Sequence, residues 1–191
     1  MQALMTTAPA IARASGFTLI ELMIVVLIAV ILITIGVPYL GDYVADQRVR
    51  TVTSDIASDI AFTRAKAIEE SRRATITRTG ADWSGGWRIW VDLDGDGSYD
   101  AGEEVKITQG VTGGSNRLRA CALPVADFST DITFRPDGRI VRTTAAAATD
   151  GIYVIDEGRD AAVTDNAVRG VLFGTSGRTS TVRLNGTAPP C

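Results

Sequence analysis

Apolar residues are distributed unevenly along the chain, and an apolar segment runs from Leu22 to Leu40 without a charged residue. A helix of this length can cross the hydrocarbon core of a bilayer, which is about 30 Å thick, at about 1.5 Å per residue. Arg13 precedes the segment, and Asp42 and Asp46 follow it. This charge bias places the N-terminus on the cytoplasmic side. The pattern therefore predicts one membrane-spanning helix close to the N-terminus.

An amphipathic pattern continues beyond Pro38 and predicts a second helical segment over residues 41–73. Apolar residues recur there at the three- and four-residue spacing of one helix face: Val49, Val52, Ile56 and Ile60, with Ala67 extending the stripe. Charged side chains are expected to fill much of the rest: Arg48, Arg50, Asp55, Asp59, Arg64 and Lys66. We expect Gly36 and Pro38 to bend or loosen the helix, and we expect it to end near Arg72 or Arg73.

From about Ala74 onward the chain has the alternating and β-branched patterns of short strands. We expect them at Thr75–Arg78, Trp87–Asp92, Val105–Thr108, Asp131–Arg135, Arg139–Thr143, Gly151–Asp156, Ala167–Phe173 and Thr179–Leu184. Pro136-Asp137-Gly138 predicts a tight turn, because proline fixes φ and glycine accepts a positive φ. The predicted fold class is α+β: a long N-terminal helix, membrane-spanning first and amphipathic second, packed on an antiparallel β-sandwich-like domain at residues 74–191.

Two cysteines are present, Cys121 and Cys191. A membrane span would deliver them to an oxidising compartment, where a disulfide persists. Pairing would close a long loop and stabilise the domain by roughly 2–4 kcal/mol. The alternative is two free thiols.

Residues typical of catalysis are missing from the chain. It has no histidine, which removes the commonest general base, and it has no Walker loop, nucleophile elbow or zinc spacing. The net charge of −3 does not indicate a nucleic-acid partner. The three tryptophans, Trp83, Trp87 and Trp90, are expected to be sheet and core aromatics. The sequence therefore does not predict an enzyme.

One loop has the composition of a calcium site. Residues 92–103 match the EF-hand loop pattern, with a glycine at its sixth position, and the oxygen donors are Asp92, Asp94, Asp96, Ser98, Asp100 and Glu103. The carboxylates repel one another unless a cation binds, which favours calcium. Strands rather than helices are expected on both sides of the loop, which favours the alternative of a solvated hairpin tip.

A carboxylate interrupts the apolar N-terminal region at Glu21. A charge inside a membrane is costly unless it is paired, so such a residue indicates a functional site, although Glu21 could also reach the headgroups. A secretory signal peptide is the alternative for the whole segment. Such a peptide has an apolar stretch of only about 7–15 residues followed by a small-residue cleavage site, and neither condition is met here.

The residues Gly16-Phe17-Thr18-Leu19-Ile20-Glu21-Leu22-Met23 closely resemble the class III signal of type IV pilins and type II secretion pseudopilins. The resemblance implies that prepilin peptidase removes residues 1–16 by cutting after Gly16, and that Phe17 becomes an N-methylated N-terminus. Residues 17–40 would form the transmembrane and assembly helix. Glu21 would pair with the α-amino group of a neighbouring subunit, which reduces the cost of burying either charge.

Further along, three features are similar to the GspH/FimT minor pseudopilins: Ala61–Ile68, Trp83-x-x-Gly86-Trp87 and Phe173-x-x-x-Gly177-Arg178. This resemblance implies two β-sheets on the helix and a low-abundance subunit that primes or caps a type IV pilus or a type II secretion pseudopilus. Its partners would be other pilins and prepilin peptidase. It would sit in the inner membrane with the β-rich domain in the periplasm, and later at the fibre tip.

Two other functions stay open. Some FimT-like minor pilins bind DNA through a basic C-terminal stretch, and here the arginines are Arg169, Arg178 and Arg183. The arginine after Arg178 is not two residues on, and three arginines neutralise few phosphates, so a solvated strand face is the alternative. The calcium loop suggests a calcium-dependent, adhesin-like binding module at the tip.

Overall fold

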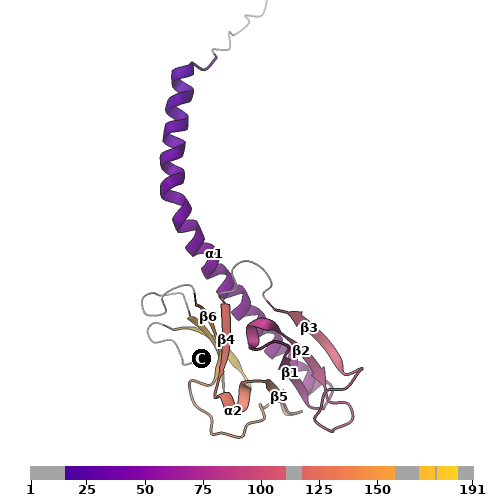
Figure 1. Ribbon diagram of the computed structural model, residues 1–191. Helices are drawn as coiled ribbons and strands as arrows, with labels where there is room; N and C mark the ends of the chain where they lie inside the picture. The colour runs from indigo at the N-terminus through magenta and orange to yellow at the C-terminus, as the bar shows by residue number, and fades with distance from the viewer. Residues whose placement is uncertain (1–15, 111–117, 158–167, 175, 185–191) are drawn as a thin grey trace, which may run out of the picture. The chain divides into compact units, whose positions relative to one another are not determined.

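The computed structural model describes residues 16–110, 118–157, 168–174 and 176–184. A long helix, α1, covers Leu19–Glu69, and short strands follow it (Figure 1). The further elements are β1 Ala74–Arg78, the 3-10 turn η1 Trp83–Gly85, β2 Gly86–Val91, β3 Glu104–Gln109, β4 Leu118–Leu123, α2 Val125–Phe128, β5 Asp131–Phe134, β6 Gly151–Asp156, β7 Val168–Phe173 and β8 Thr179–Arg183. The chain divides into two compact units, Met1–Asp42 and Tyr43–Cys191.

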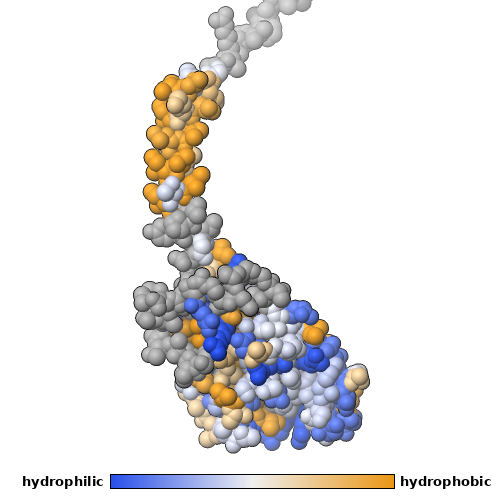
Figure 2. Space-filling model, in the orientation of Figure 1, coloured by the Kyte–Doolittle hydropathy of each residue, from blue (hydrophilic) through white to orange (hydrophobic). Residues whose placement is uncertain are grey.

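The N-terminal unit contains the apolar half of α1. The window Leu19–Gly36 has a mean hydropathy of 3.0, and 0% of it is buried. Figure 2 shows this stretch as an almost continuous apolar surface. The backbone stays helical through Gly36 and Pro38, so these residues do not interrupt the helix, and a bend there stays a prediction. A proline removes one backbone hydrogen bond, which a long helix of this kind tolerates.

The second half of α1 belongs to the C-terminal unit and buries the predicted stripe. Val49, Ile56, Ile60 and Ala67 are fully buried and Val52 nearly so, which confirms the helical spacing. The helix ends at Glu69, slightly before the expected Arg72. Ser71 adopts a φ of 52°, and the Arg72 N–H donates to the Ala67 carbonyl at 3.2 Å. This left-handed residue turns the chain out of the helix and into β1.

Two antiparallel sheets flank this part of α1. The first has the order β3-β2-β1-β5 and the second the order β4-β6-β7-β8. Their inner faces and the α1 stripe share one core, which includes Ile76, Ile89 and Phe134 from the first sheet and Val154, Val171 and Phe173 from the second. The predicted sandwich-like domain on a helix is therefore confirmed.

Some expected elements differ from the observed ones. β4 and the short α2 are not among the predicted elements, because alanine and arginine in β4 are weak strand formers. The expected strand Arg139–Thr143 forms only an isolated bridge between Ile140 and Phe134. Asp127 accepts the backbone N–H groups of Thr143 at 2.8 Å and Thr144 at 3.1 Å, and these groups are then not available to a strand.

The Asp127 carboxylate is stabilised in its charged form by this arrangement. Burial opposes its ionisation. The hydroxyl and N–H groups of Thr143 and Thr144 outweigh burial and lower the pKa of Asp127 to about 2. Thr143 and Thr144 are therefore held in place by a side chain rather than by a sheet partner.

All three tryptophans are buried and hydrogen-bonded, as expected of sheet and core aromatics. The Trp83 indole donates to the Phe128 carbonyl at 3.0 Å, and Trp90 donates to the Thr77 hydroxyl at 3.0 Å. Trp87 donates to Asp59 Oδ2 at 2.8 Å. The last bond connects the first sheet to α1.

Asp59 is expected on the polar face of α1, but it is buried under the first sheet. Besides Trp87, it accepts the Thr108 hydroxyl at 2.8 Å and pairs with the Lys106 ammonium. One carboxylate on α1 therefore holds both β2 and β3. A buried charge is tolerated when it is paired and its lone pairs are used.

Replacing Asp59 tests this connection. We expect Asp59→Ala to lower the free energy of unfolding of residues 43–191 by roughly 2–4 kcal/mol, because Trp87 and Thr108 lose their buried acceptor. Asp55 is exposed on the same helix, and Asp55→Ala is a matched control that should change stability by less than about 0.5 kcal/mol. Urea unfolding measures both variants, and equal losses would contradict a specific role for Asp59.

Candidate assembly signal, calcium loop and arginine cluster

The candidate assembly signal lies at the start of α1. Phe17 is 82% exposed, and the Glu21 N–H donates to the Thr18 hydroxyl at 3.2 Å, which caps the first turn. Residues 1–15 lie outside the described residues, so removal of the leader stays a prediction. A free α-amino group on Phe17 would place a positive charge at the positive end of the helix dipole, which is unfavourable without a nearby carboxylate. Glu21 is an exposed carboxylate in this first turn.

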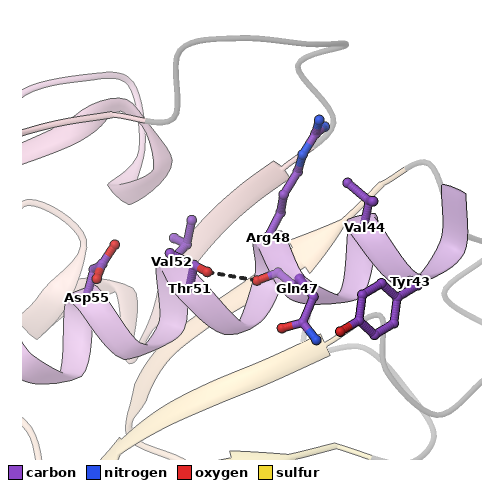
Figure 3. Close-up of a pocket in the computed structure, with 7 residues that line it drawn as sticks. All are labelled: Tyr43, Val44, Gln47, Arg48, Thr51, Val52 and Asp55. Atoms are coloured by element: carbon purple, nitrogen blue, oxygen red, sulfur yellow. Dashed lines mark hydrogen bonds between the residues drawn. The ribbon is translucent and has the colours of Figure 1, made fainter. Parts of the chain in front are cut away.

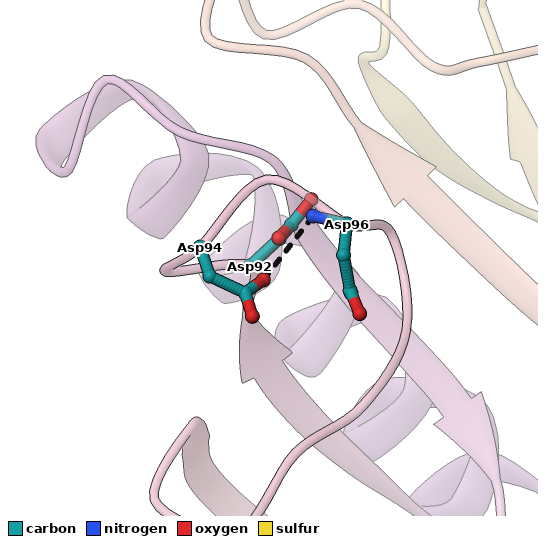
Figure 4. Close-up of side chains that lie close together, drawn as sticks. All are labelled: Asp92, Asp94 and Asp96. Atoms are coloured by element: carbon teal, nitrogen blue, oxygen red, sulfur yellow. Dashed lines mark hydrogen bonds between the residues drawn. The ribbon is translucent and has the colours of Figure 1, made fainter.

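The acidic loop connects β2 to β3 and brings three of its predicted ligands together. Carboxylate oxygens of Asp92, Asp94 and Asp96 all lie within 4.8 Å of one another (Figure 4). Backbone N–H groups fold the loop around them: Gly95 donates to Asp92 at 2.7 Å and Asp96 to Asp94 at 3.1 Å. Oxygen donors at this spacing can hold a hard cation such as calcium.

The other three predicted ligands are not gathered in the same way. Glu103 is buried, and it accepts the Leu93 N–H at 2.6 Å and the Asp100 N–H at 3.1 Å. Both carboxylate oxygens of Glu103 therefore accept backbone hydrogen bonds that hold the loop together. The Ser98 N–H donates to Asp96 at 2.6 Å. The pKa of Asp100 is raised, chiefly by Asp96 and then by burial, Asp94 and Glu103, so the loop concentrates negative charge that a cation would relieve.

The structure separates the three predicted DNA-binding arginines. Arg169 on β7 lies directly opposite Arg183 on β8, whereas Arg178 precedes β8 at its other end, in the turn that joins the two strands. The strand between them spans about 16 Å. Arg169 also faces Asp46 of α1, with 3.8 Å between Nη2 and Oδ1. These arginines therefore do not form one continuous basic strip.

The predicted disulfide is only partly described. Cys121 lies on β4, opposite Tyr153 of β6. Cys191 lies outside the described residues, and the pairing stays a prediction.

A surface groove of about 330 Å³ runs along the amphipathic half of α1 (Figure 3). The side chains that line it are Tyr43, Val44, Gln47, Arg48, Thr51, Val52 and Asp55. The Thr51 hydroxyl is satisfied by the Gln47 carbonyl at 3.0 Å.

Comparison with protein families matches two regions of the chain. The family model of the type II transport protein GspH matches residues 52–188, and that of the prokaryotic N-terminal methylation motif matches residues 11–37. The chain belongs to the GspH family. The first match begins inside the amphipathic half of α1, and the second includes Gly16, Phe17 and Glu21.

Solved structures show that this GspH-family chain has the fold of a pilin. Two crystal structures of the type IV minor pilin FimU from Pseudomonas aeruginosa match it, with TM-scores of 0.54 and 0.52 at 18% and 19% identity. Each match covers 70% of this chain, and 87% and 91% of the FimU chains. A comparison with curated proteins finds no match.

One structural site of the GspH domain is missed by the sequence analysis. The Arg64 Nε on α1 donates to the Gly138 carbonyl at 2.9 Å. Gly177 packs so closely there that an added Cβ would lie 2.2 Å from this carbonyl oxygen. The glycine of the Gly177-Arg178 pair therefore serves close packing between the turns of the two sheets. The sequence feature that could have indicated this contact is the glycine in each of the two turns, Gly138 and Gly177, both of which have a positive φ.

Calcium binding to the β2–β3 loop can be tested by its effect on the melting temperature of the domain. We expect millimolar calcium to raise the melting temperature of residues 43–191 by several degrees, because a ligand that binds only the folded state stabilises it. Asp94→Asn with Asp96→Asn should remove the rise, because the loop then keeps only one of the three carboxylates that lie together, and both replaced side chains are exposed.

Asp137→Asn is the matched control for the calcium experiment, because Asp137 is also an exposed aspartate beside a turn glycine. It should leave the calcium response unchanged. An absent response in the unmodified protein, or an equal response in the double variant, would contradict a calcium site in this loop.

Proposed function

We propose that this GspH-family protein is a non-enzymatic structural subunit that primes or caps a type IV pilus or a type II secretion pseudopilus. The observation that carries the proposal is the first half of α1. It is apolar, is not buried by any described part of the chain, and bears one carboxylate, Glu21, in its first turn. A helix of this kind is stable only in lipid or among other apolar helices.

In this proposal the subunit is first a membrane protein and then a part of the fibre. In the inner membrane, α1 spans the bilayer with its N-terminus in the cytoplasm and the β-rich domain in the periplasm. Prepilin peptidase then cuts after Gly16, and Phe17 becomes the methylated N-terminus. In the fibre, the apolar half of α1 packs among the same segments of other subunits, and Glu21 pairs with a neighbour's α-amino group.

A minor subunit is favoured over the main fibre subunit because both matching crystal structures are of a protein described as a minor pilin. The two binding functions have less support. Arg178 lies apart from Arg169 and Arg183, which reduces the number of phosphates that a DNA duplex could meet. The calcium loop gathers three of six predicted ligands, and this alone does not define an adhesin.

Replacing Glu21 tests the assembly role. We expect Glu21→Ala to reduce the fibre-associated fraction of the subunit at least about tenfold, which corresponds to a lost pairing of about 1.4 kcal/mol. The melting temperature of the C-terminal domain should not change, because Glu21 lies in the other compact unit.

Leader cleavage is measured in the same experiment as the intact mass of the membrane-extracted protein. Both the unmodified protein and Glu21→Ala should begin at Phe17. Glu69→Ala, which removes an exposed carboxylate at the far end of α1, should assemble normally. Normal assembly of Glu21→Ala, or a mass that retains residues 1–16, would contradict the proposal.

A further inference from the structure

The groove on the amphipathic half of α1 carries two side chains of opposite charge. Arg48 and Asp55 both line it, and both are exposed (Figure 3). Within the part of the chain that the structure describes, neither of them has an ion-pair partner. They are seven residues apart, which corresponds to about 10.5 Å along the helix. Both charges are therefore available to a molecule outside the chain.

The rest of the groove offers apolar surface. Val52 is nearly buried, whereas Tyr43 and Val44 are 61% and 40% exposed. The Thr51 hydroxyl donates to the Gln47 carbonyl at 3.0 Å, so it does not need a partner from solvent. Exposed apolar side chains that lie next to one another and are bordered by charged ones favour contact with another molecule.

The spacing of the two charges favours a helix as the occupant. A partner helix that lies along α1 presents residues seven positions apart on one face, again about 10.5 Å apart. An extended strand places side chains of one face about 6.6 or 13 Å apart, and neither distance matches. Helices that dock in apolar grooves also present their anchors at helical spacing. The fitting partner is therefore a helix with an acidic and a basic residue seven positions apart.

A second copy of this chain fits poorly when its α1 runs parallel to the first. In register, Arg48 would face Arg48 and Asp55 would face Asp55, and like charges placed opposite each other select against such a pair. A shift of two helical turns would pair one Arg48 with one Asp55 and leave the other two charges unpaired. The groove therefore discriminates against its own helix in a parallel arrangement.

We propose that this groove binds the helix of a different pilin subunit. That helix carries an acidic residue opposite Arg48, a basic residue opposite Asp55 and an apolar residue between them. Exposed ion pairs add little affinity each, so the apolar contact supplies most of the binding and the charges choose the partner. The inference rests on the proposed function for the presence of other pilins and for the parallel arrangement of subunits.

The test measures the binding of designed helical peptides to the full chain in a neutral detergent, by fluorescence anisotropy. One peptide carries an apolar residue between a glutamate and an arginine that are seven positions apart. A control peptide of the same composition has the two charges five positions apart, on different faces. We expect the first peptide to bind about threefold more tightly, because only it forms both ion pairs. Equal binding, or no binding of either peptide, would overturn the proposal.

Charge reversal in the protein identifies the groove as the binding site. Arg48→Glu should weaken binding of the first peptide about fivefold, and a peptide with arginine at both positions should restore it. Arg139→Glu makes the same change of charge at an exposed arginine outside the groove, and it should leave binding unchanged. Equal losses in the two variants, or no recovery with the two-arginine peptide, would contradict recognition by the groove.

Self-association distinguishes a different subunit from a second copy. Light scattering of the full chain in detergent should give the same mass for the unmodified protein and for Arg48→Glu. Self-association that Arg48→Glu abolishes would identify a second copy as the occupant and overturn the assignment. None of these measurements requires a fibre or leader cleavage, so a failure here is distinct from a failure of the proposed function, which Glu21→Ala tests.

Discussion

The apolar half and the amphipathic half of α1 need different surroundings, and the rest of the structure depends on this difference. No residue of the described window Leu19–Gly36 is buried, whereas the stripe from Val49 to Ala67 belongs to the domain core. A single helix therefore needs two kinds of partner. Its own sheets cover the second half, whereas the described part of the chain leaves the first half exposed, and an apolar helix surface of this kind favours an apolar environment.

The domain is fixed to α1 by polar contacts as well as by the apolar stripe. Asp59 holds β2 and β3 through Trp87, Lys106 and Thr108. Arg64 holds the turn at Gly138, against which Gly177 of the second sheet packs. Each contact joins a specific point of α1 to a specific strand or turn, which apolar packing alone does not do. The sheets are consequently positioned on the helix, not merely gathered around it.

Much of this fold could be predicted, because the spacing of apolar residues along a helix or strand indicates which of its faces is buried. The spacing of Val49, Val52, Ile56 and Ile60 predicts the buried face, and most strands follow from β-branched alternation. The burial of Asp59 could not be predicted. An acidic residue beside the apolar stripe of a helix is normally exposed to solvent, and the partners that bury Asp59 lie on strands that are distant in the sequence. β4 was missed for lack of strand formers. Gly16, Phe17 and Glu21 form a local motif that can be recognised in the sequence, and their roles stay predictions. The approach of Arg169 to Asp46 needs the sheets and could not be predicted.

We expect the apolar half of α1 to contribute nothing to the stability of the domain, because its described residues are not buried. The most direct measurement compares the melting temperature of the full chain with that of residues 43–191 in the same detergent. The two values are predicted to agree within about 2 °C, since no residue of the described window Leu19–Gly36 is buried. A fall of more than about 10 °C on deletion would show that residues 1–42 belong to the fold of the domain, and it would contradict the account.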